Sequence, residues 1–424
     1  MKSFEKIIGY ESVKNELYQI IDMFKNKEMY VNMGARTLNG VLIYGRPGLG
    51  KTMLAEALIA ECGIKAYTIR NNKNERELIR EINMVFTEAL NKEKCIIFFD
   101  DLDKFSESSD NDVDDRIFVT VQANIDSAKD KDVLIIATVN NYRKLPDSLK
   151  RSGRFDRKIG LDRPTNEEAS KIIEYYLKKK KVDANLNYED VGKMINYTSC
   201  ADLETILNES AILSAYARKE FIDINDIAKA YLKYHYEILD ESFECSEEVI
   251  ASTSVHEAGH AVIAEALKYG CVGFLSVQQT GRNNMSGFTH LCEVINEAPE
   301  NILIALGGKV AVELFYNGRC AMGCSSDLKK ALDLIQREIT ASGTNGVGML
   351  YFDIPYKVSD SMMARVEIAI QSEMERYLYI AKEILLKNKE FVLNLAEELK
   401  KKNTLLYSDI QRVRSSVQVI DLNI

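Results

Sequence analysis

The stretch "GVLIYGRPGLGKTMLAEALIAE" (residues 40–61) decides the fold class. It begins with a short apolar run typical of a buried strand, continues through a glycine-rich loop, and ends in a helical pattern. The loop has the spacing Gly-x4-Gly-Lys-Thr, with Gly45, Gly50, Lys51 and Thr52 at the fixed positions. A strand, such a loop and a helix in this order form a P-loop, whose backbone N–H groups surround phosphates. The stretch therefore predicts an α/β nucleotide-binding domain.

The same loop predicts which residues hold a nucleotide. Lys51 is expected to reach the β- and γ-phosphates of ATP, and the Thr52 hydroxyl is expected to bind Mg²⁺. Glycines allow the backbone to fold closely around the phosphates. The predicted nucleotide-binding residues of the loop are Gly45, Arg46, Pro47, Gly48, Leu49, Gly50, Lys51 and Thr52.

Two later stretches predict strands that end in polar side chains. "CIIFFDDLDK" (residues 95–104) ends its apolar run at Asp100 and Asp101, and "VLIIATVN" (residues 133–140) ends at Asn140. In an open α/β sheet, ligands bind at the carboxyl ends of the strands. We therefore expect Asp100 to bind the Mg²⁺ shell, Asp101 to orient the attacking water, and Asn140 to contact the γ-phosphate or that water.

The second half of the chain contains "TSVHEAGHAVIAEAL" (residues 253–267), which has an H-E-x-x-H pattern. On a helix, His256 and His260 are four residues apart, so both imidazoles point the same way and can bind one zinc ion. Glu257 can reach a zinc-bound water and act as its general base. The pattern therefore predicts a zinc-dependent peptide hydrolase.

The sequence predicts the start of this helix and the third zinc ligand less directly than it predicts the two histidines. Ser252 or Thr253 is predicted to cap a helix that continues to about Tyr269. Two histidines leave a tetrahedral zinc site one protein ligand short. From the residues alone, the third ligand is His235, His290 or a carboxylate.

Composition limits the class of protein. A chain of 424 residues, 46% hydrophobic and 28% charged, is typical of a globular protein with two or three domains. Its net charge of −9 argues against a nucleic-acid partner and against binding to anionic lipid. Eight cysteines without a CxxC pair or a signal peptide predict reduced thiols in the cytoplasm. Cys320 and Cys324 are four apart and could meet on one helical turn, so a redox or metal role for this pair is the alternative. No apolar run approaches the roughly 18–20 residues that span a bilayer.

Four segments together resemble the FtsH family, the membrane AAA+ zinc proteases. They are "GARTLNGVLIYGRPGLGKT", "CIIFFDDLD", "SGRFDR" and "TSCADLETILNESAILSA", and their order and spacing match those of the family. The resemblance covers nearly the whole chain and implies an AAA+ ATPase that forms a ring, normally a hexamer. It implies that Arg154 and Arg157 are arginine fingers that act on the nucleotide of the next protomer. It also implies a helical lid over residues 166–236, which the 3.6-residue apolar period independently predicts.

The resemblance also chooses among the alternatives for the third zinc ligand. "ILIALGGKVAVELFYNGRCAMGCSSDLKKALDLIQRE" (residues 302–338) is similar to the family segment that carries an aspartate ligand. The matching position in this chain is Asp327, and Ser325 is expected to cap its helix. Amphipathic helices with a structural role are expected to follow to the end of the chain.

Together these inferences predict three domains and one main function. An α/β AAA+ nucleotide-binding domain (1–165) precedes a helical lid (166–240) and a mainly helical H-E-x-x-H zinc peptidase domain (241–424). The predicted protein is an ATP-dependent zinc endopeptidase with Zn²⁺, ATP and Mg²⁺ as cofactors and polypeptides as substrates. "FLSVQQTGRNNMSGFTHL" (residues 274–291) is expected to supply an edge strand that pairs with extended substrate. The alternatives are an AAA+ remodelling or assembly ATPase with little proteolysis, and a metallopeptidase whose nucleotide domain is only structural.

The chain departs from the family pattern at several places. Asp101 replaces the usual glutamate, which predicts slow ATP hydrolysis, and Cys200 replaces a glycine of the lid motif with little consequence. "RNNKNERELIREINMV" (residues 70–85) is shorter than the family segment with the pore loop and lacks its aromatic-hydrophobic-glycine step, which predicts weak threading. The family's transmembrane anchor is missing. We therefore expect a soluble cytoplasmic protein, or the cytosolic part of a membrane-anchored protease that meets the membrane only through a missing anchor or a partner.

Overall fold

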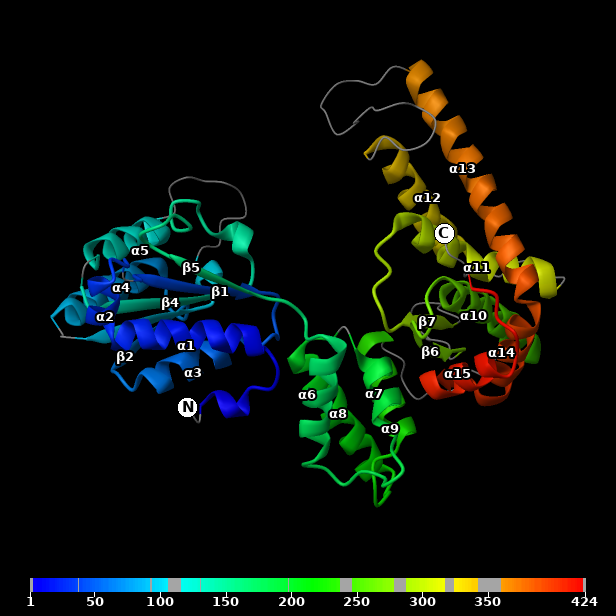
Figure 1. Cartoon of the computed structure of the whole chain (residues 1–424), viewed down its shortest axis with the longest axis horizontal. Helices are drawn as coiled ribbons and strands as arrows, with labels where there is room; N and C mark the ends of the chain where they lie inside the picture. Colours follow the sequence, from blue (N-terminus) through cyan, green and yellow to red (C-terminus); the bar gives the residue numbers. More distant parts are fainter. Residues whose placement is uncertain are drawn as a thin grey trace. The chain divides into compact units, whose positions relative to one another are not determined.

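The structure, a computed structural model, describes residues 3–36, 38–91, 94–105, 116–129, 131–196, 198–236, 246–277, 287–316, 324–341 and 360–421. It contains two compact units (Figure 1). The first comprises Met1–Lys179 with Tyr197–Asn208, and the second comprises Lys180–Asn196 with Glu209–Ile424. The predicted domain boundaries after residues 165 and 240 remain predictions, and the second of them lies outside the described residues.

A parallel sheet of five strands forms the centre of the first unit, in the order β2-β3-β4-β1-β5. Residue pairs such as Arg70 with Asp100 and Tyr44 with Val139 are in register, so the carboxyl ends of neighbouring strands lie along one edge. The strands are β1 (Gly40–Gly45), β2 (Ala66–Arg70), β3 (Cys95–Asp100), β4 (Val133–Val139) and β5 (Arg157–Leu161).

Helices cover both faces of this sheet, which explains why β3 and β4 are apolar throughout. Alternate residues of a strand point to opposite faces. Ile96 and Phe98 pack with α1 and α3, whereas Ile97 and Phe99 pack with α4 and α5. The helices of this region are η1 (Phe4–Lys6), α1 (Glu11–Lys25), α2 (Lys27–Asn32), α3 (Lys51–Cys62), α4 (Glu75–Leu90), η2 (Leu102–Lys104), α5 (Arg116–Ser127) and η3 (Tyr142–Lys144). The predicted α/β class is therefore confirmed.

Among the described residues between 166 and 236, four helices follow the sheet, as the apolar period predicts. They are α6 (Asn166–Leu177), α7 (Tyr188–Ile195), α8 (Cys200–Tyr216) and α9 (Ile224–Tyr236). α6 begins with a capping box, in which the side chains of Thr165 and Glu168 each accept from the backbone N–H of the other. α8 is one continuous helix, although the first unit ends at Asn208 and the second resumes at Glu209.

The second unit is mainly helical, as predicted, and holds a small antiparallel sheet in the order β7-β6-β8. Its two central helices, α10 and α11, approach closely at a pair of glycines. A Cβ atom at Gly259 would lie 2.4 Å from the Gly307 carbonyl oxygen, and one at Gly307 would lie 2.7 Å from the Gly259 carbonyl oxygen. The elements are α10 (Glu247–Leu267), β6 (Val272–Ser276), β7 (Phe288–Leu291), α11 (Ala298–Phe315), α12 (Cys324–Thr340), α13 (Asp360–Lys387), α14 (Lys389–Lys402), β8 (Thr404–Leu406) and α15 (Tyr407–Ser415).

The prediction that Ser252 or Thr253 caps α10 is wrong. The helix begins at Glu247, and the side chain of Ser246 accepts a hydrogen bond from the backbone N–H of Val249. Two acidic residues in the first turn favour this earlier start because they complement the positive end of the helix dipole. The two predicted caps therefore lie inside the helix.

The C-terminal helices α13, α14 and α15 contribute apolar side chains to the core of the second unit. None of the helices within the described ranges has both the length and the apolar composition that crossing a bilayer requires.

Free thiols are found at five described cysteines, in agreement with the prediction of reduced cysteines: Cys62, Cys95, Cys200, Cys271 and Cys292. At Cys324 that prediction is wrong, since this residue is disulfide-bonded. Disulfide formation depends on the distance between Cβ atoms in the fold, which the spacing of cysteines in a sequence does not give.

Candidate metal centre and nucleotide site

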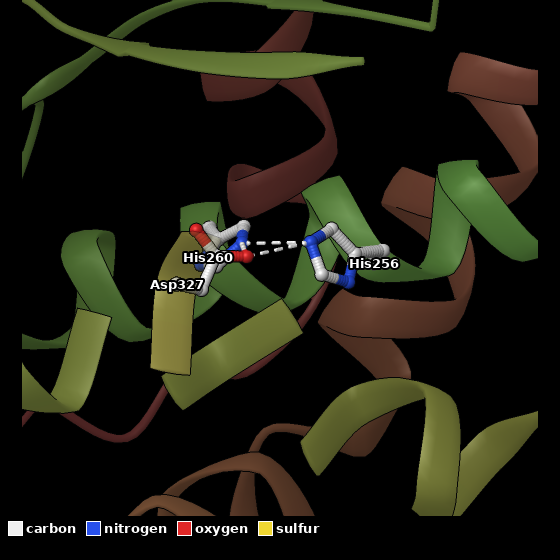
Figure 2. Close-up of side chains that lie close together, drawn as sticks. All are labelled: His256, His260 and Asp327. Carbon is white, nitrogen blue, oxygen red and sulfur yellow. Dashed lines mark hydrogen bonds and ion pairs between the residues drawn. The ribbon is translucent and has the colours of Figure 1, made fainter. Parts of the chain in front are cut away.

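His256 and His260 on α10 and Asp327 on α12 bring three metal-binding atoms together (Figure 2). The Nε2 atoms of the two imidazoles are 3.1 Å apart. The Oδ2 atom of Asp327 lies 3.1 Å from His256 Nε2 and 3.3 Å from His260 Nε2. Zinc bonds of about 2.0–2.1 Å in a tetrahedral arrangement separate the ligand atoms by about 3.3 Å. The spacing therefore fits one zinc ion with a fourth position left for another ligand.

The backbone of α11 orients His260. Its Nδ1 atom lies 2.6 Å from the carbonyl oxygen of Ile304 and 3.3 Å from the backbone nitrogen of Gly308. The much shorter contact is to an acceptor, so we assign the ring proton to Nδ1, which donates to Ile304. The Nε2 atom is then left with the lone pair that a metal needs. A hydrogen bond from the far ring nitrogen to a carbonyl oxygen is typical of histidines that bind zinc.

Helix α11 also passes over both imidazoles at Gly308. A Cβ atom at this position would lie 2.5 Å from His256 Cε1 and 2.5 Å from His260 Nε2. Both separations are far shorter than a van der Waals contact between such atoms. The two rings therefore have room only because residue 308 has no side chain.

Of the alternatives for the third ligand, the structure places Asp327 beside the two histidines. His290 lies elsewhere in the second unit, where its Nε2 donates to Asn196 Oδ1 at 3.1 Å and its Nδ1 accepts from the Tyr231 hydroxyl at 3.2 Å. His235 is exposed, and its ring packs against that of Tyr231. The geometry therefore favours a carboxylate over a third histidine.

The prediction that Ser325 caps the helix of Asp327 is wrong. α12 begins at Cys324, one residue earlier, so Ser325 lies within the first turn. Asp327 also lies in this turn, where the helix dipole favours a carboxylate. Burial would raise the pKa of Asp327, but its close contacts with the imidazoles of His256 and His260 outweigh burial and hold that pKa well below its usual range. The carboxylate is therefore negatively charged at the metal position.

Glu257 lies directly beside the first histidine and is only 5% exposed. The hydroxyl of Thr289 donates to its Oε2 atom at 2.8 Å. Burial raises the pKa of the Glu257 carboxyl group, and the nearby rings of His260 and His256 offset this only in part. A raised pKa gives the carboxylate more affinity for a proton, which is what a general base needs.

His290 gives the second unit a predicted dependence on pH. Burial lowers the pKa of His290 to about 4, and nearby His235 adds to this effect. Between pH 6.5 and 4 the unfolded chain therefore binds more protons at this residue than the folded chain, so stability falls as the pH falls. Neutral His290 is expected to contribute up to about 3 kcal/mol that is lost across this window.

The measurement is the denaturant midpoint of unfolding at several pH values between 7.5 and 4. His290→Gln can still donate to Asn196 but does not titrate, so its midpoint should fall less steeply than that of the unsubstituted chain. Parallel curves for the two proteins would contradict this prediction.

In the first unit, the P-loop meets the ends of β3 and β4 at Asp100. Its Oδ1 atom accepts from the Thr52 hydroxyl at 3.0 Å and from the Thr138 hydroxyl at 2.9 Å. Its Oδ2 atom lies 3.2 Å from Arg70 Nε at the end of β2. The predicted pair of Mg²⁺ ligands, Thr52 and Asp100, is therefore in direct contact.

The P-loop itself is held by its own lysine. The Nζ atom of Lys51 donates to the carbonyl oxygens of Gly45 and Arg46, at 2.8 and 2.7 Å. Burial lowers the pKa of Lys51, although the charge of Asp101 acts in the other direction. Gly48 and Gly50 have φ angles of +78° and +86°, which glycine adopts without strain. Of the remaining predicted loop residues, Pro47 precedes Gly48, and the buried Leu49 lies between Gly48 and Gly50.

Asp101 joins the end of β3 to the end of β4. Its Oδ1 accepts from Asn140 Nδ2 at 2.8 Å, and its Oδ2 pairs with Lys104 Nζ at 2.6 Å. Asp103, almost fully buried, accepts from the backbone N–H groups of Asn140 at 3.0 Å and Asn141 at 2.9 Å. The predicted water-orienting residue and the strand-end amide are therefore neighbours, and Asp103 fixes the loop that carries the amide.

The two predicted arginine fingers are held by acidic side chains of their own unit. Arg154 makes two hydrogen bonds to Asp126, at 3.0 and 2.8 Å, and they lower the pKa of Asp126 to about 2. Arg157 lies 3.5 Å from Glu16. The Arg157 side chain is 40% exposed and that of Arg154 is 16% exposed. Arg157 is therefore the more accessible of the two.

Sequence reasoning missed several residues that the structure places in these sites. Thr138 had a usable signal, because it is a polar residue in an otherwise apolar strand next to the predicted Mg²⁺ ligand. Asp103 lies three residues after Asp100, but three acidic residues in one short segment do not reveal which role each has. Thr289 and Gly308 carry no local signal, since their importance comes from segments far away in the sequence.

Similarity to known proteins extends over nearly the whole chain. The sequence profile of the ATPase family associated with various cellular activities (AAA) matches residues 41–163, and that of Peptidase family M41 matches residues 244–413. The chain is 28% identical over 446 residues to the "ATP-dependent zinc metalloprotease FtsH" of Mycoplasmoides gallisepticum, and 26% identical over 441 residues to that of Ureaplasma parvum. Each match covers 98% of this chain but only 58% and 61% of those relatives. The "ATP-dependent zinc metalloprotease FtsH 1" of Alkaliphilus metalliredigens is 28% identical over 98% of this chain and 74% of its own length.

Proposed function

Because the chain belongs to the FtsH family of AAA+ zinc metalloproteases, we propose that it is an ATP-dependent zinc endopeptidase. The observation that carries the proposal is the cluster of His256, His260 and Asp327 beside the buried Glu257. The same chain has a P-loop whose Thr52 bonds to a strand-end carboxylate. An ATPase in the first unit would thus deliver polypeptide to a peptidase site in the second.

The peptidase chemistry follows from the four residues of the metal centre. His256, His260 and Asp327 would hold zinc through Nε2, Nε2 and Oδ2, since these atoms have the spacing of tetrahedral ligands. When bound, zinc supplies Lewis acidity, which polarises a carbonyl group and acidifies water. Glu257 accepts the proton of the attacking water at its carboxylate and delivers it to the leaving amine.

The ATPase chemistry follows from the residues at the strand ends. Thr52 and Asp100 would hold Mg²⁺, because hydroxyl and carboxylate oxygens are its usual ligands. Lys51 would leave the loop carbonyls and bind the β- and γ-phosphates. Asp101 would orient the attacking water, with Asn140 fixing the position of the Asp101 carboxylate through their hydrogen bond.

The proposal includes the assembly and the substrates. Polypeptides would be the substrates, and the protein would work as a homo-oligomeric ring, with six protomers as the proposed number. Arg157 and Arg154 would act as arginine fingers on the nucleotide of the next protomer. Arg157 is the better placed, because the guanidinium of Arg154 already makes two hydrogen bonds to Asp126.

The proposed activities are divided among the predicted domains. Residues 1–165 would bind the nucleotide, residues 166–240 would form a helical lid, and residues 241–424 would form the peptidase.

Extended substrate would pair with β7, which forms hydrogen bonds only with β6 among the described strands. Residues 278–286 of this predicted edge segment lie outside the described residues. A cytoplasmic location, or the cytosolic part of a membrane-anchored protease, is proposed because every described cysteine except Cys324 is a free thiol, which a reducing compartment preserves.

The proposed function is tested by cleavage of casein and of a short fluorogenic peptide. We expect one zinc per chain, cleavage of both substrates, loss of cleavage with a zinc chelator, and recovery when zinc is added back. ATP should accelerate the cleavage of casein more than that of the peptide, and Lys51→Ala should remove this acceleration. Cleavage that persists with the metal removed would refute the zinc mechanism.

The remodelling ATPase with little proteolysis is the weaker alternative. A scaffold has no use for three metal-binding atoms within bonding reach of one another and a buried glutamate beside them. The third reading, a purely structural nucleotide domain, predicts equal ATPase rates for Lys51→Ala and the unsubstituted chain, whereas we expect the variant to be inactive.

Asp101 predicts a specific change in the rate of ATP hydrolysis. The Asp101→Glu carboxylate would reach one methylene further than the present one, which now bonds Asn140 and Lys104. We expect this variant to raise kcat for ATP by roughly 10-fold, since misplacement by about 1 Å is costly in catalysis. Asp147→Glu, on a side chain that is 90% exposed, is the control. Unchanged turnover in Asp101→Glu would show that the shorter side chain is not limiting.

The segment after β2 predicts weak threading of folded substrates. β2 ends at Arg70 and α4 begins at Glu75, so only four residues connect them, and the side chain of Asn74 caps the helix. This short polar link has no aromatic side chain that could hold a substrate polypeptide during threading. A stably folded tagged protein should resist ATP-dependent degradation, while the same protein with a destabilising core substitution should be degraded. Rapid degradation of both would refute this prediction.

A further inference from the structure

Strand β7 and the residue before it meet Glu257 through residues 289 and 287. These positions are two apart, so in extended backbone they face the same side. At residue 289, the threonine hydroxyl lies 2.8 Å from Glu257 Oε2 and 3.2 Å from the Glu257 carbonyl oxygen. At residue 287, a Cβ atom would lie 2.8 Å from Glu257 Oε1 and 2.7 Å from Thr253 Cγ2. Oε2 therefore accepts from this segment, and Oε1 borders the space that a side chain at residue 287 would fill.

The two contacts act in different ways. A threonine hydroxyl has one hydrogen to donate, and the shorter distance directs it to the carboxylate oxygen Oε2. Because Thr289 lies in a strand that pairs with β6, its hydroxyl is presented from a rigid element. Gly287 contributes only space: it has a φ angle of +145°, and any side chain there would overlap Oε1 and α10.

We propose that Thr289 and Gly287 are positioning residues that select the side-chain conformation in which Glu257 serves as general base. Thr289 holds Oε2, so the other oxygen, Oε1, is the one that takes the proton from water. Gly287 keeps the volume around Oε1 free of side-chain atoms. The inference rests on the proposed peptidase function and assigns it two residues outside the metal ligands and the base.

The physical reason is the length of the glutamate side chain. A glutamate has three rotatable bonds, and a general base must lie within hydrogen-bond reach of the proton that it removes. Neighbouring residues in contact with a catalytic group can fix that geometry without touching the substrate. Loss of such a contact should lower kcat and leave KM and zinc affinity nearly unchanged.

The test compares Thr289→Val, Thr289→Ser and Gly287→Ala with the unsubstituted chain. Thr404→Val is the matched control, because Thr404 lies in β8 at the opposite edge of the same sheet. The measurements are kcat and KM for a short fluorogenic peptide, zinc affinity by competition with a chelator, and the melting temperature. Removing one contact to a catalytic group typically costs roughly 10–100-fold, so Thr289→Val is expected to lose that much in kcat.

The serine variant distinguishes a positioning role of Thr289 from a packing role. Thr289→Ser keeps the hydroxyl and should retain kcat within roughly threefold of the unsubstituted value, although it packs less well than valine. Gly287→Ala should lose kcat as Thr289→Val does, and Thr404→Val should retain it. Unchanged kcat in Thr289→Val, equal losses in the serine and valine variants, or loss of zinc from Thr289→Val would overturn the inference. Absence of zinc-dependent cleavage by the unsubstituted chain would instead overturn the proposed function, and this inference with it.

Discussion

Glu257→Gln is expected to lower kcat for peptide cleavage by about 10²–10⁴-fold, the usual contribution of a general base. An amide cannot take a proton from water at neutral pH, but it has nearly the same shape as the carboxylate. Its oxygen can still accept from the Thr289 hydroxyl, so the surroundings of the metal should remain in place. Zinc content should therefore stay at that of the unsubstituted chain, and ATP hydrolysis should continue.

The control for this variant is Glu248→Gln, an exposed position in the first turn of the same helix. It removes the same charge from α10 without touching the metal centre, and it should cleave peptides at the normal rate. Retained cleavage in Glu257→Gln with zinc bound would assign the base to another group. Loss of zinc would show that this glutamate supports the metal rather than the proton transfer.

Gly308→Ala is expected to lose zinc binding and, with it, all zinc-dependent cleavage. The added methyl group would lie 2.5 Å from ring atoms of both His256 and His260, so at least one imidazole must rotate or α11 must shift. Overpacking of this kind costs about 1–3 kcal/mol. Because the three ligand atoms now lie 3.1–3.3 Å apart, a small displacement separates them beyond the reach of one ion.

The measurement is zinc bound per chain after dialysis, together with the cleavage rate of a short peptide. Glu313→Ala, at a side chain that is 51% exposed on the same helix, is the control and should bind zinc normally. Full zinc occupancy in Gly308→Ala would show that the helix can move away from the rings at little cost, and the steric explanation would fail.

Much of the nucleotide site could be predicted because it is encoded locally. The P-loop spacing between Gly45 and Thr52 is fixed by the path of the backbone around phosphate. Asp100 and Asn140 could be placed because the carboxyl ends of parallel strands lie along one edge of a sheet. The structure places Thr52, Asp100, Asp101 and Asn140 within one network of hydrogen bonds.

The metal centre was only partly predictable from the residues. His256 and His260 follow from helical spacing, but Asp327 is 67 residues further along and came only from the family resemblance. Nothing local distinguishes that aspartate from any other acidic residue at a helix start. The predicted start of α10 is wrong for a related reason. Several serines and threonines near the motif could each cap the helix, and the acidic residues of the first turn favour the cap at Ser246.

The contacts of Thr289 and Gly308 could not be predicted from sequence. Each depends on how closely a strand or a helix approaches α10, and that separation is set by packing over the whole second unit. Gly259 and Gly307 illustrate this point. A glycine within a helix normally lowers the stability of that helix. Here the two glycines instead allow the backbones of α10 and α11 to come into direct contact.

That glycine contact has a consequence for how the proposed zinc site would take up its metal. Many small zinc proteins collapse without their ion, because the ligands are brought together only by the metal itself. Here the two imidazoles are carried by a helix whose distance from α11 is fixed by direct backbone contact. We therefore expect the two imidazoles to stay near each other in the folded chain with or without an ion, so that folding of this helix pair does not depend on the metal. A chain from which zinc has been removed is therefore expected to stay folded and to regain its proposed cleavage activity when zinc is added back.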